Sequence, residues 1–253
     1  MKPVLLEARS VCKHFGGVRA LHEVSLTIRQ GEIYGLIGPN GAGKTTLFNV
    51  LTGLYSASSG AFQFAGAPLA ISAPHLVAQA GIARTFQNIR LFANMTALEN
   101  VMVGRHVRTH AGIIGAVLRG AATRAEEAAI QQRAVELLHY VGIADRANDL
   151  ARNLPYGDQR RLEIARALAT DPKLLALDEP VAGMNATETA ALRVLIEGLR
   201  ADGLTILLIE HDVKLVMGLC DRVAVLDYGE KIAEDVPEKV QRNPQVIEAY
   251  LGA

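Results

Sequence analysis

The first part of the chain carries the alternating hydrophobic pattern of β-strands. Residues 5–10, 21–28 and 60–71 are predicted strands, the second with apolar residues at every other position. Residues 32–37 form a mostly apolar run, which is typical of a buried strand. The N-terminal portion of the molecule is therefore predicted to be rich in β-structure.

The middle of the chain has the spacing of helices and is rich in alanine. Helices are predicted over residues 98–104 and 123–140. Thr123 is followed three residues later by Glu126, a capping-box pattern that places a helix start at Thr123. A further helix is expected after Pro155, because apolar residues then recur at helical spacing.

Three apolar runs in the last part of the chain predict more buried strands, at residues 174–177, 205–209 and 222–226. Helical segments separate them, and strands that alternate with helices indicate an α/β fold with a parallel sheet. Ligands of such sheets bind at the carboxyl ends of the strands. The residues that follow each run are therefore candidates for a functional site.

The composition narrows the choice of function. The 253 residues can form a large core in one domain or in two closely packed lobes. Lys plus Arg and Asp plus Glu each number 26, which argues against a nucleic-acid binder that relies on a basic field. Cys12 and Cys220 form no paired motif and fit a reducing compartment. With no secretory signal and no apolar run near the ~18 residues of a bilayer crossing, any membrane span is expected on other chains.

One segment carries a phosphate-binding pattern of Gly, four residues, Gly-Lys-Thr. It lies between the predicted strand 32–37 and a predicted helix over 44–51 that Gly53 can end. Its glycines let backbone amides surround a polyphosphate at a helix N-terminus. Lys44 is expected to reach the β- and γ-phosphates, and the Thr45 hydroxyl to hold Mg²⁺. The agreement of strand, loop and helix argues against an accidental glycine-rich turn. The predicted nucleotide-binding residues are Gly38, Pro39, Asn40, Gly41, Ala42, Gly43, Lys44, Thr45 and Thr46.

Acidic and polar residues follow the later strands. Asp178 and Glu179 end the run 174–177, where Asp178 would hold the Mg²⁺ shell and Glu179 would polarise an attacking water. His211, after the next strand, is placed to donate to the γ-phosphate or to steady the water, although a lone histidine is more often structural. Gln87, after a short apolar stretch, could contact the metal or the water and report the nucleotide state to a partner.

Taken in order, these motifs resemble those of ATP-binding cassette (ABC) ATPases over nearly the whole chain: the phosphate loop, Gln87, residues 154–161, Asp178-Glu179 and His211. Within that family several segments are similar to the larger type of ATPase in branched-chain amino-acid importers. These segments are residues 81–88, 91–96, 104–123, 156–165 and 182–185.

The resemblance implies the fold of a P-loop NTPase of the ABC ATPase type. That fold is α/β, with a mixed core sheet, an antiparallel β subdomain and an inserted α-helical subdomain. A single ABC ATPase domain would cover residues 1–253. Residues 1–87 and 166–253 would form the RecA-like core with the β lobe, and residues 88–165 the helical lobe.

The resemblance also assigns roles to residues. Two such chains would close head to tail on two ATP molecules, the 180–185 stretch crossing the interface. Phe15, which spacing alone places in the core, would stack on adenine. Tyr156, Gly157 and Asp158 would contact in trans the γ-phosphate bound by the other subunit. The implied catalytic residues are Glu179, His211, Gln87 and Lys44, and Mg²⁺ would be held by Thr45, by Gln87 and, through water, by Asp178.

The implied function is ATP hydrolysis that powers uptake of branched-chain or related amino acids. The implied cofactors are ATP and Mg²⁺. The implied partners are two transmembrane permease subunits, a second ABC ATPase subunit (a paralogue or another copy) and, indirectly, a periplasmic or extracellular solute-binding protein. No nucleic-acid partner is expected. Such a chain would be peripheral, at the cytoplasmic face of the inner (plasma) membrane, and the Gln87 region and helical lobe would receive the permeases.

The sequence departs from the usual family pattern in two places. The common Leu-Ser-Gly-Gly-Gln is here Leu-Pro-Tyr-Gly-Asp at residues 154–158. Pro155 has no N–H to donate, and the Asp158 carboxylate must point away from a γ-phosphate or repel it. Asn185 replaces a common aspartate. Both departures resemble the branched-chain subfamily.

Three alternatives remain. The ATPase of a lipid or lipopolysaccharide exporter shares the Gln87 and His211 regions. The second is a soluble ABC-type ATPase of DNA repair or translation. DNA-repair members of that kind carry a long coiled-coil insertion between the phosphate loop and Asp178, and no heptad tract is present. A GTPase would be expected to show an Asn-Lys-x-Asp motif, which this chain lacks.

A basic segment at residues 101–123 contains no carboxylate and is either a solvated surface or a contact surface for a membrane partner or anionic lipid. Its basic residues are Arg105, His106, Arg108, His110 and Arg119.

Overall fold

A computed structural model describes residues 2–69, 73–108 and 121–251. Contacts divide the chain into a first unit, Met1–Arg84, Lys173–Pro180 and Arg193–Ala253, and a second unit, Thr85–Pro172 and Val181–Leu192. The predicted lobe boundaries near residues 88 and 165 stay a prediction. Within the described ranges no helix combines the length and the apolar character that a bilayer crossing needs.

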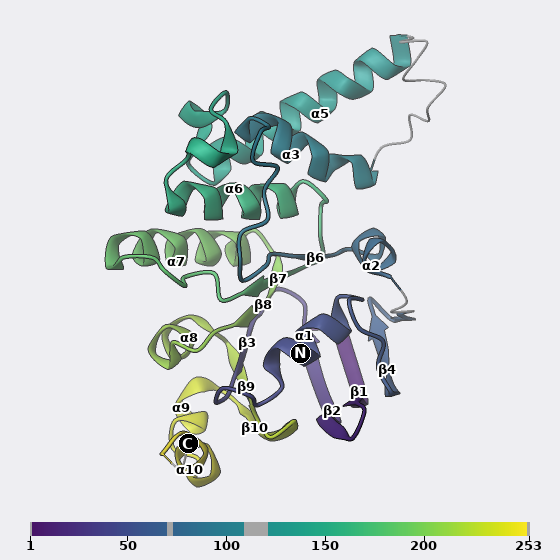
Figure 1. The fold of residues 1–253 in the computed structure, drawn as a ribbon, viewed down its shortest axis with the longest axis vertical. Coiled ribbons are helices and arrows are strands. Elements are labelled where there is room, and N and C mark those ends of the chain that lie inside the picture. The colour runs from purple at the N-terminus through teal and green to yellow at the C-terminus, as the bar shows by residue number, and fades with distance from the viewer. Residues whose placement is uncertain (1, 70–72, 109–120, 252–253) are drawn as a thin grey trace. The chain divides into compact units, whose positions relative to one another are not determined.

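A six-stranded sheet forms the centre of the first unit, in the order β10-β9-β3-β8-β7-β6 (Figure 1). Only β10 is antiparallel to its neighbour; the other pairs are parallel. Every residue of β3, β7 and β8 is buried, as their continuous apolar sequences predict. The strands are β3 (Ile33–Ile37), β6 (Ile82–Arg84), β7 (Leu174–Asp178), β8 (Thr205–Ile209), β9 (Arg222–Asp227) and β10 (Glu230–Asp235).

An antiparallel sheet in the order β2-β1-β4-β5 makes up the β subdomain of the first unit. Its strands are β1 (Val4–Phe15), β2 (Val18–Arg29), β4 (Ser59–Phe64) and β5 (Ala67–Pro68). The predicted end of the first strand at Ser10 is wrong, because β1 continues through an irregular register there with Ser10 at φ 46°. The predicted strand 60–71 is two strands with a turn at Ala65 and Gly66, and residues 70–72 lie outside the described ranges.

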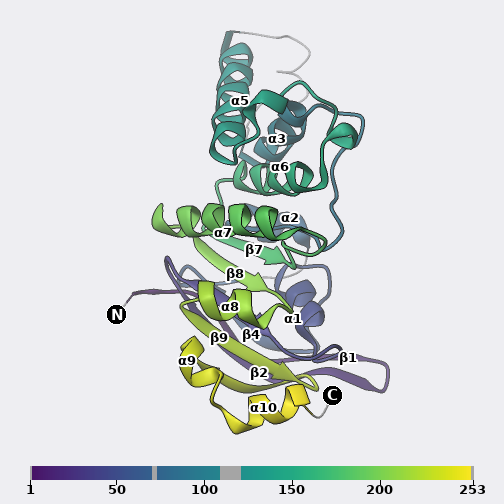
Figure 2. The same ribbon diagram turned by 90° about the vertical axis from the view of Figure 1, so that its left-hand side faces the viewer.

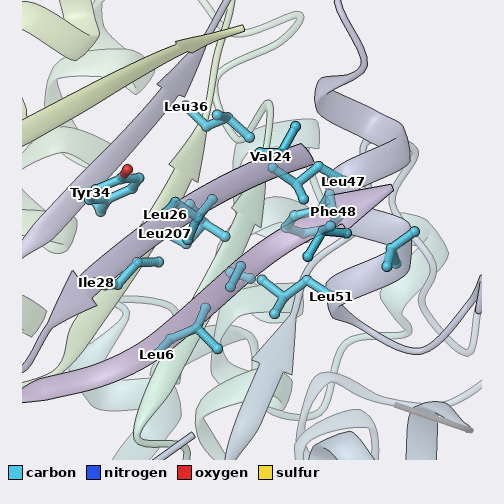
Figure 3. Close-up of a cluster of buried hydrophobic side chains, with 14 of the residues drawn as sticks. Leu6, Val24, Leu26, Ile28, Tyr34, Leu36, Leu47, Phe48, Leu51 and Leu207 are labelled. Carbon is cyan, nitrogen blue, oxygen red and sulfur yellow. The ribbon is translucent and has the colours of Figure 1, made fainter. Parts of the chain in front are cut away.

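Helix α1 (Lys44–Leu51) packs its apolar face into a core shared with both sheets. Phe48 and Leu51 of α1 belong to one buried cluster with Leu6 of β1 and Leu36 of β3 (Figure 3). The helix ends as predicted: Gly53 has φ 78°, and its N–H donates to the Val50 carbonyl at 3.2 Å. This packing fixes the loop that precedes α1.

The other helices of the first unit are α2 (Pro74–Ala80), α8 (Val213–Leu219), α9 (Pro237–Val240) and α10 (Pro244–Leu251). Figure 2 shows α9 and α10 beside the β9–β10 hairpin, which they contact. α10 also brings its residues close to the phosphate loop, because Glu248 and Pro39 line the same hollow of about 480 Å³.

The second unit is built from helices. α3 (Ala97–Arg105) packs against α5 (Ala121–Tyr140) and α6 (Tyr156–Leu168). Short 3₁₀ turns occur at η1 (His106–Arg108), η2 (Ala144–Arg146) and η3 (Ala151–Asn153), and α7 (Ala186–Ala201) begins here and continues into the first unit. Residues 109–120, most of the predicted basic segment, lie outside the described ranges.

The predicted capping box at Thr123 is wrong. Ala121 and Ala122 already belong to helix α5, so Thr123 lies within the helix and is not its N-cap, since the alanines before it favour helix. A capping box does form at the start of α3. The Thr96 hydroxyl accepts from the Glu99 N–H at 3.1 Å, and the Glu99 carboxylate accepts from the Thr96 N–H at 2.8 Å.

Candidate functional site

The register of the parallel sheet brings the candidate residues of the first unit to one edge. Leu36 of β3 and Asp178 of β7 both pair with Ile209 of β8. The Glu179 N–H then donates to the Ile209 carbonyl at 2.9 Å. The phosphate loop, the Asp178-Glu179 pair and the residues after β8 therefore share the carboxyl edge of the sheet.

The phosphate loop folds in a way that two of its glycines make possible. Gly38 has φ 153° and Gly43 has φ 98°. A Cβ on Gly38 would lie 2.1 Å from the Leu226 carbonyl oxygen, and one on Gly43 would lie 2.8 Å from the Ala20 carbonyl oxygen. Both positions thus need glycine for backbone conformation and for close approach to neighbouring chain.

Lys44, the first residue of α1, is only 7% exposed. Its ammonium donates to the carbonyls of Gly38 at 2.6 Å and Pro39 at 2.9 Å, across the loop. Burial lowers the pKa of Lys44, while the carboxylates of Glu179 and Asp178 act to raise it. The lysine therefore lies within electrostatic reach of both predicted acidic residues.

Asp178, at the end of β7, is 4% exposed and faces an arginine that sequence reasoning missed. Arg84 Nη2 lies 3.8 Å from Asp178 Oδ2. The same guanidinium donates to Asn49 Oδ1 at 3.0 Å and Thr52 Oγ1 at 2.6 Å, and its carbon lies 4.4 Å from the centre of the Phe48 ring. Arg84 thus links Asp178 to α1, and only the pairing of β6 with β7 could have revealed it.

Glu179 and His211 face each other after β7 and β8. The Glu179 Oε2 to His211 Nδ1 distance is 3.5 Å, and Glu210 Oε2 lies 3.8 Å from the same nitrogen. The His211 side chain is 59% exposed, whereas Glu210 is fully buried. The imidazole can therefore reach a solvent-side ligand while two carboxylates orient it.

Phe15, at the end of β1, is 44% exposed. Its ring meets Tyr55 edge to face, with ring centres 5.3 Å apart, and Lys13 Nζ lies 4.9 Å from the Phe15 ring centre. This exposure contradicts the core placement that spacing alone favours. An exposed aromatic pair with a cation beside it suits stacking on a planar base. Tyr55 was not predicted, since it lies in the loop after α1 and its partner Phe15 lies in β1.

The remaining predicted residues belong to the second unit. Gln87 is exposed, and its carbonyl accepts from Arg160 Nη2 at 2.8 Å. The Tyr156 hydroxyl donates to the Ala182 carbonyl at 2.9 Å. Gly157 is buried in the first turn of α6, where a Cβ would lie 3.0 Å from Glu188 Oε1.

Two departures from the family pattern have local explanations here. Pro155 precedes the first turn of α6 with φ −54°, an N-terminal position at which proline's missing N–H leaves no helical hydrogen bond unmade. Asp158 lies in the first turn, where a carboxylate stabilises the helix N-terminus. Asn185 caps α7, since its Oδ1 accepts from the Glu188 N–H at 3.0 Å and Glu188 Oε2 accepts from the Asn185 N–H at 3.0 Å.

The oxygen donors near the phosphate loop suit Mg²⁺ better than a metal ion whose ligands all come from the protein. Thr45 is exposed at the loop, and Asp178 offers a carboxylate within electrostatic reach of the neighbouring Lys44. Among the described residues no group of three or more His, Cys, Asp or Glu could hold a metal ion. Mg²⁺ commonly takes one or two protein oxygens and completes its shell with water and phosphate.

Comparison with known families gives two matches. Residues 21–182 match a family described as ABC transporter. Residues 230–253, which include β10, α9 and α10, match one described as branched-chain amino acid ATP-binding cassette transporter.

Individual relatives agree with these matches. The chain is 46% identical over 253 residues to the high-affinity branched-chain amino acid transport ATP-binding protein LivG of Salmonella typhimurium, covering 100% of this chain and 99% of that protein. It is 34% identical to the lipopolysaccharide export system ATP-binding protein LptB of Haemophilus influenzae, covering 98% of this chain and 97% of that protein.

Solved structures are similar over almost the full chain. The ADP conformation of MJ1267, an ATP-binding cassette of an ABC transporter, has a TM-score of 0.85 and 31% identity, with 99% of each chain covered. A dimeric post-hydrolysis state of the ATP-binding cassette MJ0796 bound to ADP and Pi has a TM-score of 0.77 and 25% identity, with 92% of this chain and 99% of that chain covered.

Proposed function

Because this chain belongs to the ABC transporter family and has its ATPase fold, we propose that it is the ATP-hydrolysing subunit of an importer of branched-chain or related amino acids. The observation that carries the proposal is the full-length similarity to LivG, extended by the branched-chain match at residues 230–253. The higher identity to LivG than to LptB favours import over lipopolysaccharide export.

ATP binding is assigned to the carboxyl edge of the central sheet. Amides of the phosphate loop and the Lys44 ammonium would bind the phosphates, and the exposed Phe15 ring would stack on adenine. Thr45 and Asp178, with Gln87, would hold Mg²⁺ (Asp178 through water). When bound, that ion supplies charge neutralisation on the phosphates.

Hydrolysis requires a water aimed at the γ-phosphorus. Glu179 would accept a hydrogen bond from that water and take its proton as the new P–O bond forms and the bond to ADP breaks. His211 would donate to the γ-phosphate from its position beside Glu179. Lys44 and Gln87 complete the proposed catalytic set.

A second ABC ATPase subunit, a paralogue or another copy, is proposed to complete each site with Tyr156, Gly157 and Asp158. The dimeric relative bound to ADP and Pi supports such pairing. Two transmembrane permease subunits would carry the solute, and a periplasmic or extracellular solute-binding protein would deliver it. The chain would act at the cytoplasmic face of the plasma membrane.

The test is reconstitution of the chain with its permease and ATPase partners in vesicles that contain ATP. Glu179→Gln should retain ATP binding and lose both hydrolysis and leucine uptake, because glutamine cannot take the proton from water. Glu197→Gln, on the exposed side of α7, is the matched control and should behave as wild type. Hydrolysis at the wild-type rate by Glu179→Gln would refute the role of Glu179.

The same vesicles separate import from export. A leucine-loaded binding protein should increase ATP hydrolysis, whereas a vesicle without binding protein should show only the basal rate. If loaded binding protein has no effect and lipopolysaccharide stimulates hydrolysis, the export alternative replaces import.

A further inference from the structure

Helix α6 contains an ion pair that is removed from solvent and plays no part in the mechanism above. Arg160 Nη1 lies 2.8 Å from Glu163 Oε2, and the two side chains are 0% and 1% exposed. Charges are buried at high cost unless they are paired and hydrogen-bonded. The remaining hydrogen-bond partners of these two side chains therefore indicate the role of the pair.

Those partners are backbone groups of the segment that carries Gln87. Arg160 donates through Nη1 to the Phe86 carbonyl at 2.7 Å and through Nη2 to the Gln87 carbonyl at 2.8 Å. Glu163 Oε1 accepts from the N–H groups of Phe86 and Arg90, both at 3.3 Å. The pair thus binds donors and acceptors of one exposed segment and leaves the Gln87 residue itself exposed.

Arg160 is also linked to a third segment through Tyr156, which lies on the same helix. Its Nη2 lies 3.3 Å from the Tyr156 hydroxyl, and the guanidinium carbon lies 6.0 Å from the centre of the Tyr156 ring. The same hydroxyl donates to the Ala182 carbonyl at 2.9 Å. The guanidinium therefore connects Gln87 to the start of α6 and, through the Tyr156 hydroxyl, to Ala182 of the 181–185 stretch, all within the second unit.

The pair is poorly suited to a purely stabilising role. Burial raises the pKa of Glu163, against the opposing effect of Arg160. Arg160 Nε is buried and has no hydrogen-bond partner among the described residues. Apolar residues of similar volume often stabilise such a position as well as an ion pair does. What apolar residues cannot supply is the set of hydrogen bonds to the backbone of residues 86–90.

We propose that Arg160 and Glu163 are positioning residues that clamp the Gln87 segment to α6 and the 181–185 stretch, so that the parts of the ATPase machinery carried by the second unit move as one body. The proposal rests on the proposed function, in which Gln87 and the start of α6 act on ATP. Neither residue of the clamp would touch nucleotide. Loosening the clamp should therefore lower the rate of hydrolysis more than the affinity for ATP.

The first test compares Glu163→Gln with wild type in the reconstituted complex. Glutamine keeps the shape of the side chain but removes the charge that holds Arg160, so kcat should fall about tenfold to a hundredfold, as for other residues that orient a catalytic group. The KM for ATP should stay within about twofold. Glu197→Gln, in an exposed Arg–Glu pair on α7, should change neither constant. Equal loss of kcat in both variants, or no loss in either, would overturn the clamp.

A double-mutant cycle asks whether the effect passes through Gln87. In a Gln87→Ala background, Glu163→Gln should lower kcat little further, because the group that it positions is already gone. If kcat of the double variant fell by the product of the two single-variant factors, Glu163 would act independently of Gln87, and the proposal would be refuted.

Folding and function are separated by two further measurements. Arg160→Met combined with Glu163→Leu fills the same space with apolar atoms and leaves no unpaired buried charge. Its midpoint of thermal unfolding should therefore fall less than that of Arg160→Met alone, while kcat falls. Amide hydrogen exchange of Phe86 and Arg90 in Glu163→Gln should rise at least about tenfold, whether or not the complex transports amino acids. Unchanged exchange would refute the clamp and leave the proposed function in place. A wild-type complex without ATPase activity would refute the proposed function and leave the clamp in place.

Discussion

At the scale of single residues, the phosphate loop depends on glycines that differ in what surrounds them. Gly38 and Gly43 approach the backbone of other segments, whereas a Cβ added to Gly41, at φ 81°, would have nothing within 4 Å. An added Cβ at Gly41 would strain only the backbone conformation. An added Cβ at Gly38 would strain the conformation and also overlap neighbouring atoms. Gly41 is therefore a matched control for a substitution at Gly38.

Gly38→Ala should lower the free energy of unfolding by about 2–4 kcal/mol, because the added Cβ would overlap the Leu226 carbonyl at 2.1 Å. Gly41→Ala should cost only about 1 kcal/mol, the usual penalty for a left-handed non-glycine residue. Urea unfolding followed by circular dichroism measures both. Equal losses in the two variants would contradict the close approach at Gly38.

Phe15→Ala should weaken ATP binding by about tenfold, since stacking of a base on an aromatic ring contributes about 1–3 kcal/mol. Phe15→Tyr should keep the affinity, because it preserves the ring face. Val18→Ala, at a neighbouring residue that is 66% exposed, is the control. Isothermal titration with ATP measures all three, and unchanged affinity in Phe15→Ala would remove this ring from the site.

At the scale of elements, sequence patterns predicted the features that depend on residues close together in the chain. The strand before the phosphate loop, α1 and its end at Gly53 were all predicted, because apolar period and glycine conformation are local properties. Arg84, Tyr55 and the Arg160–Glu163 clamp escaped prediction, since their partners come from distant segments. Asp178, Glu179 and His211 were predicted from strand ends, but their mutual distances follow from sheet register.

The cap of α3 makes a prediction at this scale. Thr96→Ala should lower the free energy of unfolding by about 1 kcal/mol near neutral pH, as the loss of a threonine N-cap usually does. Hydrogen bonds from Thr96 lower the pKa of Glu99 from its ordinary 4.5. The Glu99 carboxylate thus stabilises the fold above that value and ceases to do so as the pH falls through its lower folded-state pKa.

Part of the cost of Thr96→Ala should accordingly disappear in acid. Urea unfolding of wild type and variant between about pH 7 and pH 3 measures the difference. A difference that grows as the pH falls would contradict the reciprocal bond between Thr96 and Glu99.

At the scale of the whole molecule, the proposed machinery is divided between the two contact units. The phosphate loop, Asp178, Glu179 and His211 belong to the first, whereas Gln87 and residues 154–158 belong to the second. Nucleotide binding should therefore depend on the first unit, and hydrolysis on both. Substitutions can separate the two activities in one chain.

Stabilisation of the folded chain by bound nucleotide measures nucleotide binding separately from hydrolysis. Mg-ADP at about a hundred times its Kd should raise the free energy of unfolding by about 2.7 kcal/mol, because it binds only the folded chain. Lys44→Ala should abolish that gain, since it removes the buried ammonium beside the loop. Gln87→Ala should retain most of it. A differential scanning measurement with and without Mg-ADP distinguishes these outcomes.

The backbone of Glu179 has a further consequence. This residue has φ 45°, a left-handed conformation that suits glycine better than glutamate. Glu179→Gly should therefore relax the main chain while it removes the carboxylate that faces His211. Thermal stability alone would favour that exchange, whereas the proposed role of Glu179 in ATP hydrolysis would oppose it.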